Sequence, residues 1–494
     1  MKSNYTLSLY RRVYERLKWE AIKLTEKGCY NKAIEAIIQS SKLAFYINDV
    51  FSDKQLDKLC KTIAQVKLHE VETAPQDSLI VYIDSNCAAN HGLTQQYIRS
   101  FIHNHYKFIF VRIDPVDPAC EPILSEIREY HNAQIITFEN KVGAIEKASI
   151  ILKLIENTCP SEIFFHLTPW DATAVLVSCM IKNIPKYYVN AIDHTFWLGA
   201  SFFDYLVDFR DVGFKVSVEK RLFSPSKIYK LPYYPIINRD SVPFKGFPSQ
   251  TNNKIVVYSG GAAYKMLSET NLYFKAIESL LEVNKNVVVL ISCIGIPNEI
   301  KKIINTLKNN DRIILLGYRD DIQEVFKHCD IYLTTYPIGG GLMGQYACVY
   351  KKPILTLYEK WNSLPFSELS IGNPFTSLKD FLNYGSHLIE SEEFRKSEGE
   401  RLARNIISED DFDKNVNMML RQNRTNYSFS NVSKISIDFN RYTELYLYME
   451  NTSLHRVPTL ILRFWGLKGI ILFPQFYYSY YTLVIVKLKR LLNI

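Results

Sequence analysis

Apolar and polar positions alternate along most of this chain in a way that predicts parallel β-α-β units. From residue 78, short apolar runs such as SLIVYIDS, KFIFVRID and EIFFHL are separated by amphipathic stretches with helical spacing, and the alternation resumes from Lys254 to Glu359. Strands that alternate with helices favour parallel sheets covered by helices. We therefore expect an α/β protein with two Rossmann-like domains that face a cleft.

Breaks in this pattern set the predicted boundaries. The segment from Asp240 to Asn253 contains two prolines and a glycine, which is typical of a linker. The predicted parts are a helical N-terminal region (1–72), an N-terminal Rossmann-like domain (73–245), a C-terminal Rossmann-like domain (254–405), returning helices with a connector (406–456), and a tail (457–494).

Composition narrows the class of protein. Of 494 residues, 47% are hydrophobic and 22% charged, as in globular proteins, and the net charge of +8 comes without a basic low-complexity arm. Disorder and nucleic-acid binding are therefore disfavoured. Nine scattered cysteines without a CxxC pair predict a reducing compartment, and the start of the chain lacks the apolar core of a signal peptide, so we expect a cytoplasmic protein.

Two glycine-containing loops follow predicted strands and are candidates for phosphate binding. The first is Tyr258-Ser259-Gly260-Gly261 with Lys265 four residues further on, where glycine lets the backbone approach a phosphate and the lysine neutralises a diphosphate. A tight turn with a solvated lysine is the alternative. The second loop, whose alternative is a flexible turn, contains Tyr336, Gly339, Gly340, Gly341, Leu342 and Met343.

The order of elements around these loops resembles the donor domain of GT-B glycosyltransferases. Gly317-Tyr318-Arg319 is followed by a helix, a strand, the glycine-rich loop, a further helix and Lys352-Pro353-Ile354. The resemblance covers about 100 residues and implies that residues 254–405 bind a nucleotide diphosphate sugar as co-substrate, with Gly317, Tyr318 and Arg319 among the donor contacts.

The chain departs from the retaining family 4 of these enzymes. Two glutamates of that family correspond here to Ile338 and Tyr346, neither of which can act as a carboxylate. The Tyr-Pro-x-Gly-Gly-Gly loop is more similar to the O-linked N-acetylglucosamine transferases and their bacterial relatives, and this resemblance implies an inverting, metal-independent reaction. No Asp-x-Asp triplet is present, so we expect neither a metal nor another cofactor.

Inverting transfer needs a base for the acceptor hydroxyl, and His194 is the first candidate. The segment from Asp193 to Gly199, followed by Asp204-Tyr205 and Asp208, is similar to the region of those transferases where a histidine and a glycine precede an aspartate-tyrosine pair. His194 as a ligand contact and His194 as a buried structural residue remain alternatives.

Asp84, at the end of the first strand of the N-terminal domain, is the second candidate base. His91, His166 and Asp171 are candidates for the cleft by position alone, although aspartates at strand ends also cap helices.

The tail from Val457 to Ile494 is rich in Leu, Ile, Phe and Tyr, contains basic residues and lacks acidic ones. Arg463, Lys468 and Pro474 interrupt any transmembrane run, so the pattern favours an amphipathic segment on an anionic membrane surface. A core-packing or oligomerising helix pair is the alternative.

Together these features predict a glycosyltransferase of bacterial surface glycan assembly, peripheral at the inner face of the cell membrane, with a lipid-linked or polysaccharide acceptor. A protein O-glycosyltransferase, a non-catalytic GT-B-like subunit of a glycosyltransferase complex, and a sugar-nucleotide 2-epimerase are the alternatives.

Overall fold

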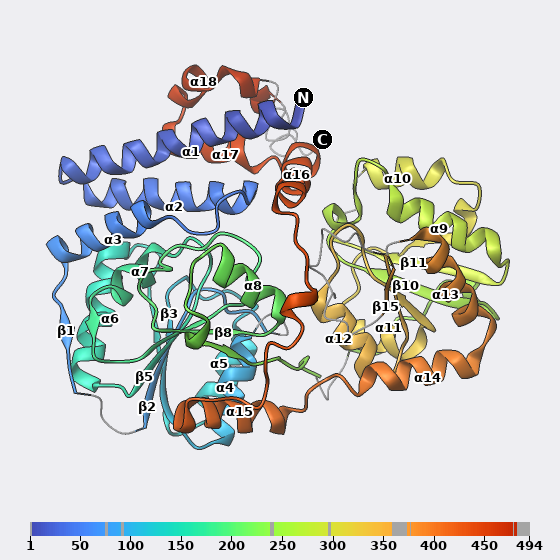
Figure 1. The fold of residues 1–494 in the computed structure, drawn as a ribbon, viewed down its shortest axis with the longest axis horizontal. Helices are drawn as coiled ribbons and strands as arrows, with labels where there is room; N and C mark the ends of the chain where they lie inside the picture. Colours follow the sequence, from blue (N-terminus) through green and yellow to red (C-terminus); the bar gives the residue numbers. More distant parts are fainter. Residues whose placement is uncertain are drawn as a thin grey trace. The chain divides into compact units, whose positions relative to one another are not determined.

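The chain folds into two compact units, each with its own parallel sheet (Figure 1). The computed structural model describes residues 2–74, 78–89, 93–237, 242–294, 298–357, 373–375, 377–477 and 479–481. Unit 1 comprises Met1–Pro232, Phe412–Phe429 and Glu450–Ile494, and unit 2 comprises Tyr233–Asp411 and Ser430–Met449. The C-terminal helices therefore belong to the same unit as the N-terminal ones.

Unit 1 contains a seven-stranded parallel sheet in the order β4-β3-β2-β5-β7-β8-β9. The order reverses between β2 and β5, which is the doubly wound arrangement of Rossmann-like domains. The strands are β2 (Leu79–Asp84), β3 (Lys107–Arg112), β4 (Ala133–Thr137), β5 (Glu162–His166), β7 (Lys186–Val189), β8 (Tyr205–Asp208) and β9 (Ile228–Lys230). A separate short parallel pair joins β1 (Val71–Glu72) to β6 (Ile181–Lys182).

Five neighbouring strands of this sheet each contribute one aromatic ring to a stacked row. Phe110, Tyr82, Phe164, Tyr187 and Tyr205 are partners in the strand register. Their successive ring centroids lie 4.9 to 6.2 Å apart. Aromatic pairs on adjacent strands stabilise a sheet beyond the area they bury. The row therefore helps to fix the register that brings the strand ends to one edge.

Helices cover both faces of this sheet, because right-handed crossovers on the two sides of the reversal lie on opposite faces. Those on one side are α4 (Thr94–His103) and α5 (Glu121–Arg128). Further helices of unit 1 that lie between or after these strands in the chain are α6 (Ala144–Thr158), α7 (Ala172–Ser178) and α8 (Asp211–Glu219). Most of α15 (Glu409–Gln422) also belongs to unit 1 and packs on α4, where the ring centroids of Phe412 and Tyr97 lie 5.3 Å apart.

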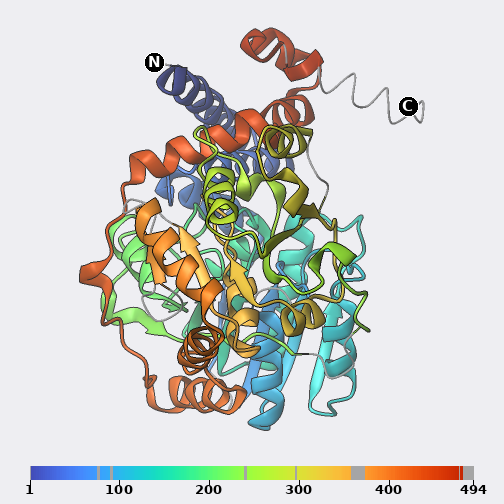
Figure 2. The ribbon, with the colours of Figure 1, turned by 90° about the vertical axis from the view of Figure 1, so that its right-hand side faces the viewer.

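The N-terminal helices of unit 1 pack with the returning C-terminal ones. α1 (Lys2–Glu26) lies alongside α2 (Tyr30–Ile47), α17 (Arg456–Trp465) packs on α2, and α3 (Lys54–Lys67) packs on α7 (Figures 1 and 2). α18 (Lys468–Leu472) and the turn η7 (Pro474–Phe476) follow α17. The Asp53 side chain caps α3 by accepting from two backbone amides, Gln55 and Leu56, and also accepts a 2.7 Å hydrogen bond from Tyr14 on α1.

Unit 2 repeats the doubly wound order with a six-stranded parallel sheet, β12-β11-β10-β13-β14-β15. The reversal lies between β10 and β13. The strands are β10 (Ile255–Gly260), β11 (Val287–Ser292), β12 (Ile313–Leu315), β13 (Ile331–Leu333), β14 (Ile354–Leu357) and β15 (Asn373–Phe375).

Alternate residues of the central strand face two separate hydrophobic clusters. Val257 belongs to one cluster, and Val256 and Tyr258 belong to the other, as the two-residue period of a strand requires. Both faces of the sheet are thus buried. The helices of unit 2 are α9 (Leu272–Val283), α10 (Asn298–Asn305), α11 (Ile322–His328), α12 (Gly341–Val349), α13 (Leu378–Glu390), α14 (Glu392–Ala403) and α16 (Phe439–Met449).

The predicted α/β class with two Rossmann-like parallel sheets and N-terminal helices is confirmed. The strand-like apolar runs are buried, and the amphipathic stretches between them form helices, as the pattern of apolar and polar positions predicts.

Candidate functional site

The two glycine-containing loops of unit 2 meet where the strand order reverses. One loop follows β10 and the other follows β13, its neighbour in the sheet. The amide of Ile338 donates to the carbonyl of Lys265 (3.4 Å), which joins the second loop to the first. The carboxyl edge at such a reversal is the usual ligand site of a doubly wound sheet.

The space around the two glycines of the first loop is tight, because the Tyr258 ring and side chains from the second loop and α12 pack against them. A Cβ added to Gly260 would lie 2.7 Å from the Tyr258 hydroxyl and 2.9 Å from Met343 Cε. A Cβ on Gly261 would lie 3.2 Å from Thr335 Cγ2. These glycines therefore let the two loops approach each other, a packing role beside the predicted approach to phosphate.

Lys265 is a half-buried cation directly after the first loop, at the strand-order reversal. Its stem passes along the first loop, with Cδ 3.9 Å from the position of a Cβ on Gly261. Burial lowers the pKa of Lys265, and within the described part of the chain no carboxylate pairs with it. A partly desolvated ammonium without a counter-charge favours binding of an anion.

The second loop leads into α12, whose first turn lacks a side-chain cap. The N-cap residue is Gly340, which has no side chain to accept from the first amides. Such a helix start attracts negative charge, because its amides and dipole are directed outward. Gly341 is exposed, whereas Leu342 and Met343 are half-buried.

Other predicted donor contacts lie in the core instead. The rings of Tyr258 and Tyr336 are buried, and the Ser259 hydroxyl accepts a 2.7 Å hydrogen bond from Tyr273. Tyr346, at the position of a family 4 glutamate, is buried and donates to the carbonyl of Ile236 (3.2 Å). We interpret these four side chains as structural.

The third predicted contact, Gly317-Tyr318-Arg319, follows β12, two strands away from β10. Arg319 forms an ion pair with Asp321 (2.5 Å) and donates to the carbonyl of Gly246 (2.9 Å). Its guanidinium is therefore already occupied. Gly317 has a φ of 71°, which favours glycine, and the Tyr318 ring is exposed.

At the reversal in unit 1, polar side chains bind one another. Asp84 and His166 end the neighbouring strands β2 and β5, and His166 Nδ1 lies 2.9 Å from Asp84 Oδ2. Thr94 donates to Asp84 (2.7 Å), and Arg112 donates to its other oxygen (3.2 Å). All four side chains are buried. We interpret Asp84 as the centre of a structural network, because each carboxylate oxygen is engaged.

The remaining positional candidates of unit 1 differ in their roles. Asp171 caps α7 by accepting from the amide of Ala174 (2.9 Å), and burial raises its pKa to about 6. It therefore serves the capping role that was the alternative to catalysis. His91 lies outside the described residues.

His194 lies in the loop after β7, the neighbour of β5 in the sheet, and its side chain is 32% exposed. His194 Nδ1 is 3.1 Å from Asp193 Oδ1. Arg210 binds both oxygens of that buried carboxylate at 2.6 Å. Burial alone would raise the pKa of Asp193, but Arg210 and His194 hold it well below its usual value. The ionised carboxylate can only accept, so Nδ1 carries the proton and Nε2 is the basic nitrogen of the neutral ring.

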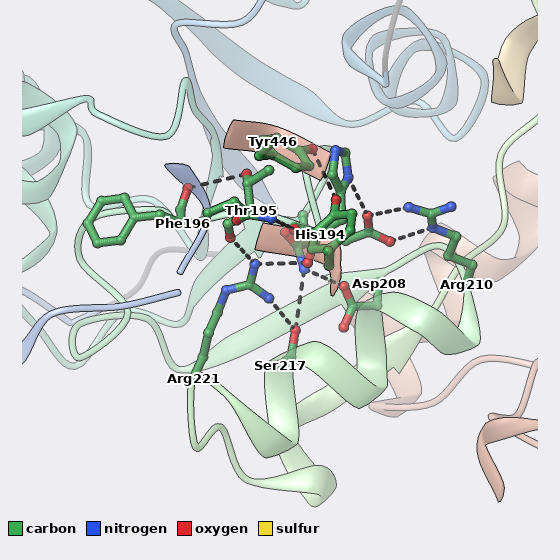
Figure 3. A network of polar contacts seen from close by, with 12 residues as sticks. His194, Thr195, Phe196, Asp208, Arg210, Ser217, Arg221 and Tyr446 are labelled. Atoms are coloured by element: carbon green, nitrogen blue, oxygen red, sulfur yellow. Dashed lines mark hydrogen bonds and ion pairs between the residues drawn. The ribbon is translucent and has the colours of Figure 1, made fainter. Parts of the chain in front are cut away.

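Two arginines approach the His194 loop from different sides (Figure 3). Arg221 is buried and donates to the carbonyls of Asp193 (2.8 Å) and Thr195 (2.5 Å), which fixes the backbone on both sides of His194. The sequence pattern did not single out Arg210 or Arg221. Both lie in the basic stretch that follows the predicted strand YLVDF, and nothing in that stretch distinguishes them from the two lysines between them.

Asp208 is a second buried carboxylate near this loop. Asn190 Nδ2 donates to it (2.5 Å), and a Cβ on Gly213 would lie within 2.8 Å of both Asp193 Oδ2 and Asp208 Oδ1. Burial, and then the charge of Asp193, raise the pKa of Asp208 to about 7. Glycine at position 213 thus allows α8 to pack directly on the pair.

Within the described ranges, no group of three or more His, Cys, Asp or Glu side chains is placed to hold a metal ion.

No protein-family model matches the sequence, and neither does any curated protein. Among solved structures, the chain is similar to an O-GlcNAc transferase of Thermobaculum terrenum, with 13% identity over 90% of this chain and 83% of that one (TM-score 0.48). It is similar to TarM of S. aureus in a complex with Fondaparinux, alpha-GlcNAc-glycerol and UDP, with 10% identity over 75% and 99% of the two chains (TM-score 0.48).

A putative UDP-N-acetylglucosamine 2-epimerase from Listeria monocytogenes gives the same TM-score of 0.48, with 10% identity over 74% of this chain and 100% of that one. At such scores and identities, the likeness assigns no reaction to this chain. Its function has to be argued from its own residues.

Proposed function

We propose that this protein is a glycosyltransferase that moves a sugar from a nucleotide diphosphate sugar to an acceptor. The observation that carries the proposal is Lys265, a half-buried ammonium without a carboxylate partner among the described residues, at the strand-order reversal of unit 2. A diphosphate supplies the negative charge that this environment favours.

The donor assignment rests on three features of the two loops at the strand-order reversal of unit 2. Gly260 and Gly261 allow close approach of the loops, Lys265 provides the cation, and the uncapped start of α12 at Gly341 provides amides. In the transfer step the bond between the sugar and the diphosphate breaks, and negative charge develops on the leaving diphosphate. Fixed cations and amides stabilise such charge without needing to reorganise.

The acceptor chemistry is assigned to His194 in unit 1. Asp193 is held ionised by Arg210 and fixes the His194 tautomer, which leaves Nε2 as the basic nitrogen. In this proposal Nε2 takes the proton of the acceptor hydroxyl while the hydroxyl oxygen bonds to the sugar carbon. The reaction is inverting and uses no metal.

We further propose that the transferred sugar is a hexose and that the acceptor is a lipid-linked or polysaccharide glycan of the bacterial surface. The acceptor assignment rests only on the composition of the C-terminal segment, which favours a location at a membrane face.

Titration calorimetry of the full chain with UDP, GDP and a panel of their sugars tests the donor site. We expect one nucleotide to bind saturably and Lys265→Ala to weaken that binding. Lys285→Ala, an exposed lysine in the same unit, is the matched control and should bind as the unaltered chain does. Absence of saturable binding, or equal binding by both variants, would reject the donor assignment.

A further inference from the structure

The C-terminal segment from Glu450 to Tyr481 is held to unit 1 by one of its faces. Val457 and Ile461 of α17 are fully buried, and Tyr10 of α1 stacks on Phe476 with ring centroids 5.6 Å apart. Tyr10 also donates to Asn451 (2.7 Å). This face is therefore part of the core of unit 1.

α18 packs closely on α17. A Cβ on Gly469 would lie 2.7 Å from Ile461 Cγ2, so only glycine permits this approach. Beyond α18, Phe473, Phe476 and Tyr480 are buried at intervals of three and four residues, which is the spacing of one helical face. The segment is thus an ordered element with a defined outer side.

That outer side is apolar and exposed. Leu467 and Ile471, four residues apart and hence on one helical face, are each 81% exposed. Tyr477 and Tyr481, also four apart, are 70% and 56% exposed. α18 lies at the margin of unit 1 in both views (Figures 1 and 2). We call Leu467, Ile471, Leu472, Tyr477 and Tyr481 the outer patch.

The charge around the outer patch is positive. Arg463 and Lys468 are exposed, and no ion pair engages either of them within the described part of the chain. From Asn451 to Ile494 the sequence contains no Asp or Glu, and the last eight residues add Lys487, Lys489 and Arg490. An apolar surface with flanking cations favours an anionic, partly apolar partner.

We propose that the outer patch docks on the surface of an anionic lipid membrane. Leu467 and Ile471 enter the boundary between head groups and acyl chains, the two tyrosines lie at head-group depth, and Arg463 and Lys468 meet the lipid phosphates. A second copy of the chain suits the patch less well, because a two-fold contact places the same cations against each other. The described residues include no helix with both the length and the apolar character needed to cross a bilayer.

Substitutions on the outer patch test this surface better than deletion of the whole segment does. Deletion of residues 457–494 would remove buried core residues such as Val457 and Ile461, so loss of binding could follow from unfolding alone. Substitutions on the outer patch leave that core in place.

The test is flotation of the full chain with vesicles of phosphatidylcholine alone or with added phosphatidylglycerol. We expect the chain to bind only the anionic vesicles. A variant that carries both Leu467→Glu and Ile471→Glu should bind these vesicles about tenfold more weakly, or weaker still. The matched control is Val66→Glu with Val283→Glu, which adds the same charge at exposed apolar positions on α3 and α9 and should bind normally. Arg463→Gln and Lys468→Gln should each weaken binding about fivefold.

Wild-type protein that does not float with anionic vesicles would overturn the proposal, as would equal flotation of the outer-patch variant and its control. A dimer that the outer-patch variant disperses, in the absence of flotation, would assign the patch to a second copy instead. Nucleotide binding by the same variant, measured by calorimetry, separates failure of this proposal from failure of the proposed reaction.

Discussion

The two sheets share a doubly wound strand order, but the strand ends at their reversals carry opposite chemistry. In unit 1, Asp84, His166, Thr94 and Arg112 bind one another and are buried. In unit 2, the same position holds two glycines, and Lys265 there has no carboxylate partner among the described residues. The shared topology thus brings strand ends together in both units, but the local pairing of charge differs between them, and our proposal places the anion in unit 2, where the cation is unpaired among the described residues.

A second contrast lies within unit 1. The network at Asp84 is closed, whereas one strand further along the sheet the carboxylate of Asp193 supports a histidine that is 32% exposed. The reactive candidate of unit 1 thus follows β7 and not the strands at the reversal. Substitutions at the two places should have different consequences.

The largest expected effect is on stability. Asp84→Ala leaves Arg112 and His166 buried without their carboxylate, and we expect the free energy of unfolding to fall by about 3–5 kcal/mol. Urea denaturation followed by tryptophan fluorescence, to which the buried Trp197 of unit 1 contributes, measures this free energy. Glu129→Ala, at an exposed position, should stay within about 0.5 kcal/mol of the unaltered chain. A similar small change for Asp84→Ala would show that the network is not structural.

Substitution of His194 should act on the reaction. We expect His194→Asn to lower kcat by about 10²- to 10⁴-fold, because no base then takes the acceptor proton, while the donor Kd stays unchanged. Rate measurements with the nucleotide sugar identified by calorimetry test this. His131→Asn, an exposed histidine of unit 1, is the control. An unchanged kcat, or a change in donor Kd alone, would remove His194 from the role of base.

Lys265→Met should separate binding from stability. The variant keeps an apolar stem but loses the cation, so we expect the Kd for the nucleotide diphosphate to rise about 10- to 100-fold. Because the lysine has no carboxylate to leave unpaired among the described residues, the free energy of unfolding should not fall. Calorimetry and urea denaturation of the same preparation check both parts, with Lys285→Met as control. If Lys265→Met lost as much stability as Asp84→Ala, the proposed difference in charge pairing between the two units would be wrong.

The most gradual expected effect is a dependence of stability on pH, which is at most about 1.4 kcal/mol for any single pH unit. Burial, and then Asp193, raise the pKa of Asp208 to about 7 in the folded chain, against about 3.9 when unfolded. The folded state then binds one more proton between these values, so stability is full below about pH 4 and falls as pH rises towards 7. Asp208 contributes at most about 1.4 kcal/mol per pH unit to the fall in the free energy of unfolding.

Asp208→Asn should remove this part of the slope, since it keeps an oxygen for Asn190 but does not ionise. Urea denaturation at several pH values compares the variant with the unaltered chain, and the difference isolates Asp208 from Asp171, whose pKa is also raised. If the free energy of unfolding changed with pH equally in both proteins, Asp208 would not titrate in this range.

The alternation of apolar runs and helical stretches was sufficient to predict two doubly wound sheets. Such runs bury both faces of a parallel sheet, and right-handed crossovers leave few ways to order the strands. The same pattern placed Gly260, Gly261, Lys265 and Gly341 at strand ends, and strand ends on one edge meet. Local sequence therefore determined the fold class and brought the two glycine-containing loops of the proposed donor site to one edge of the sheet.

Only the tertiary structure decided which charges are satisfied. Asp84 and Lys265 are both ionisable residues near a strand end in the sequence, but Asp84 gains three polar partners from β3, α4 and β5, and Lys265 gains no carboxylate among the described residues. The support of His194 by Arg210 and Arg221 likewise comes from residues 16 and 27 positions away. Pairing depends on contacts between distant segments, which the period of a sequence does not encode. In the same way, the sequence determined that residues 457–494 are apolar and basic, and packing against α1 and α2 decided which side of that segment stays exposed.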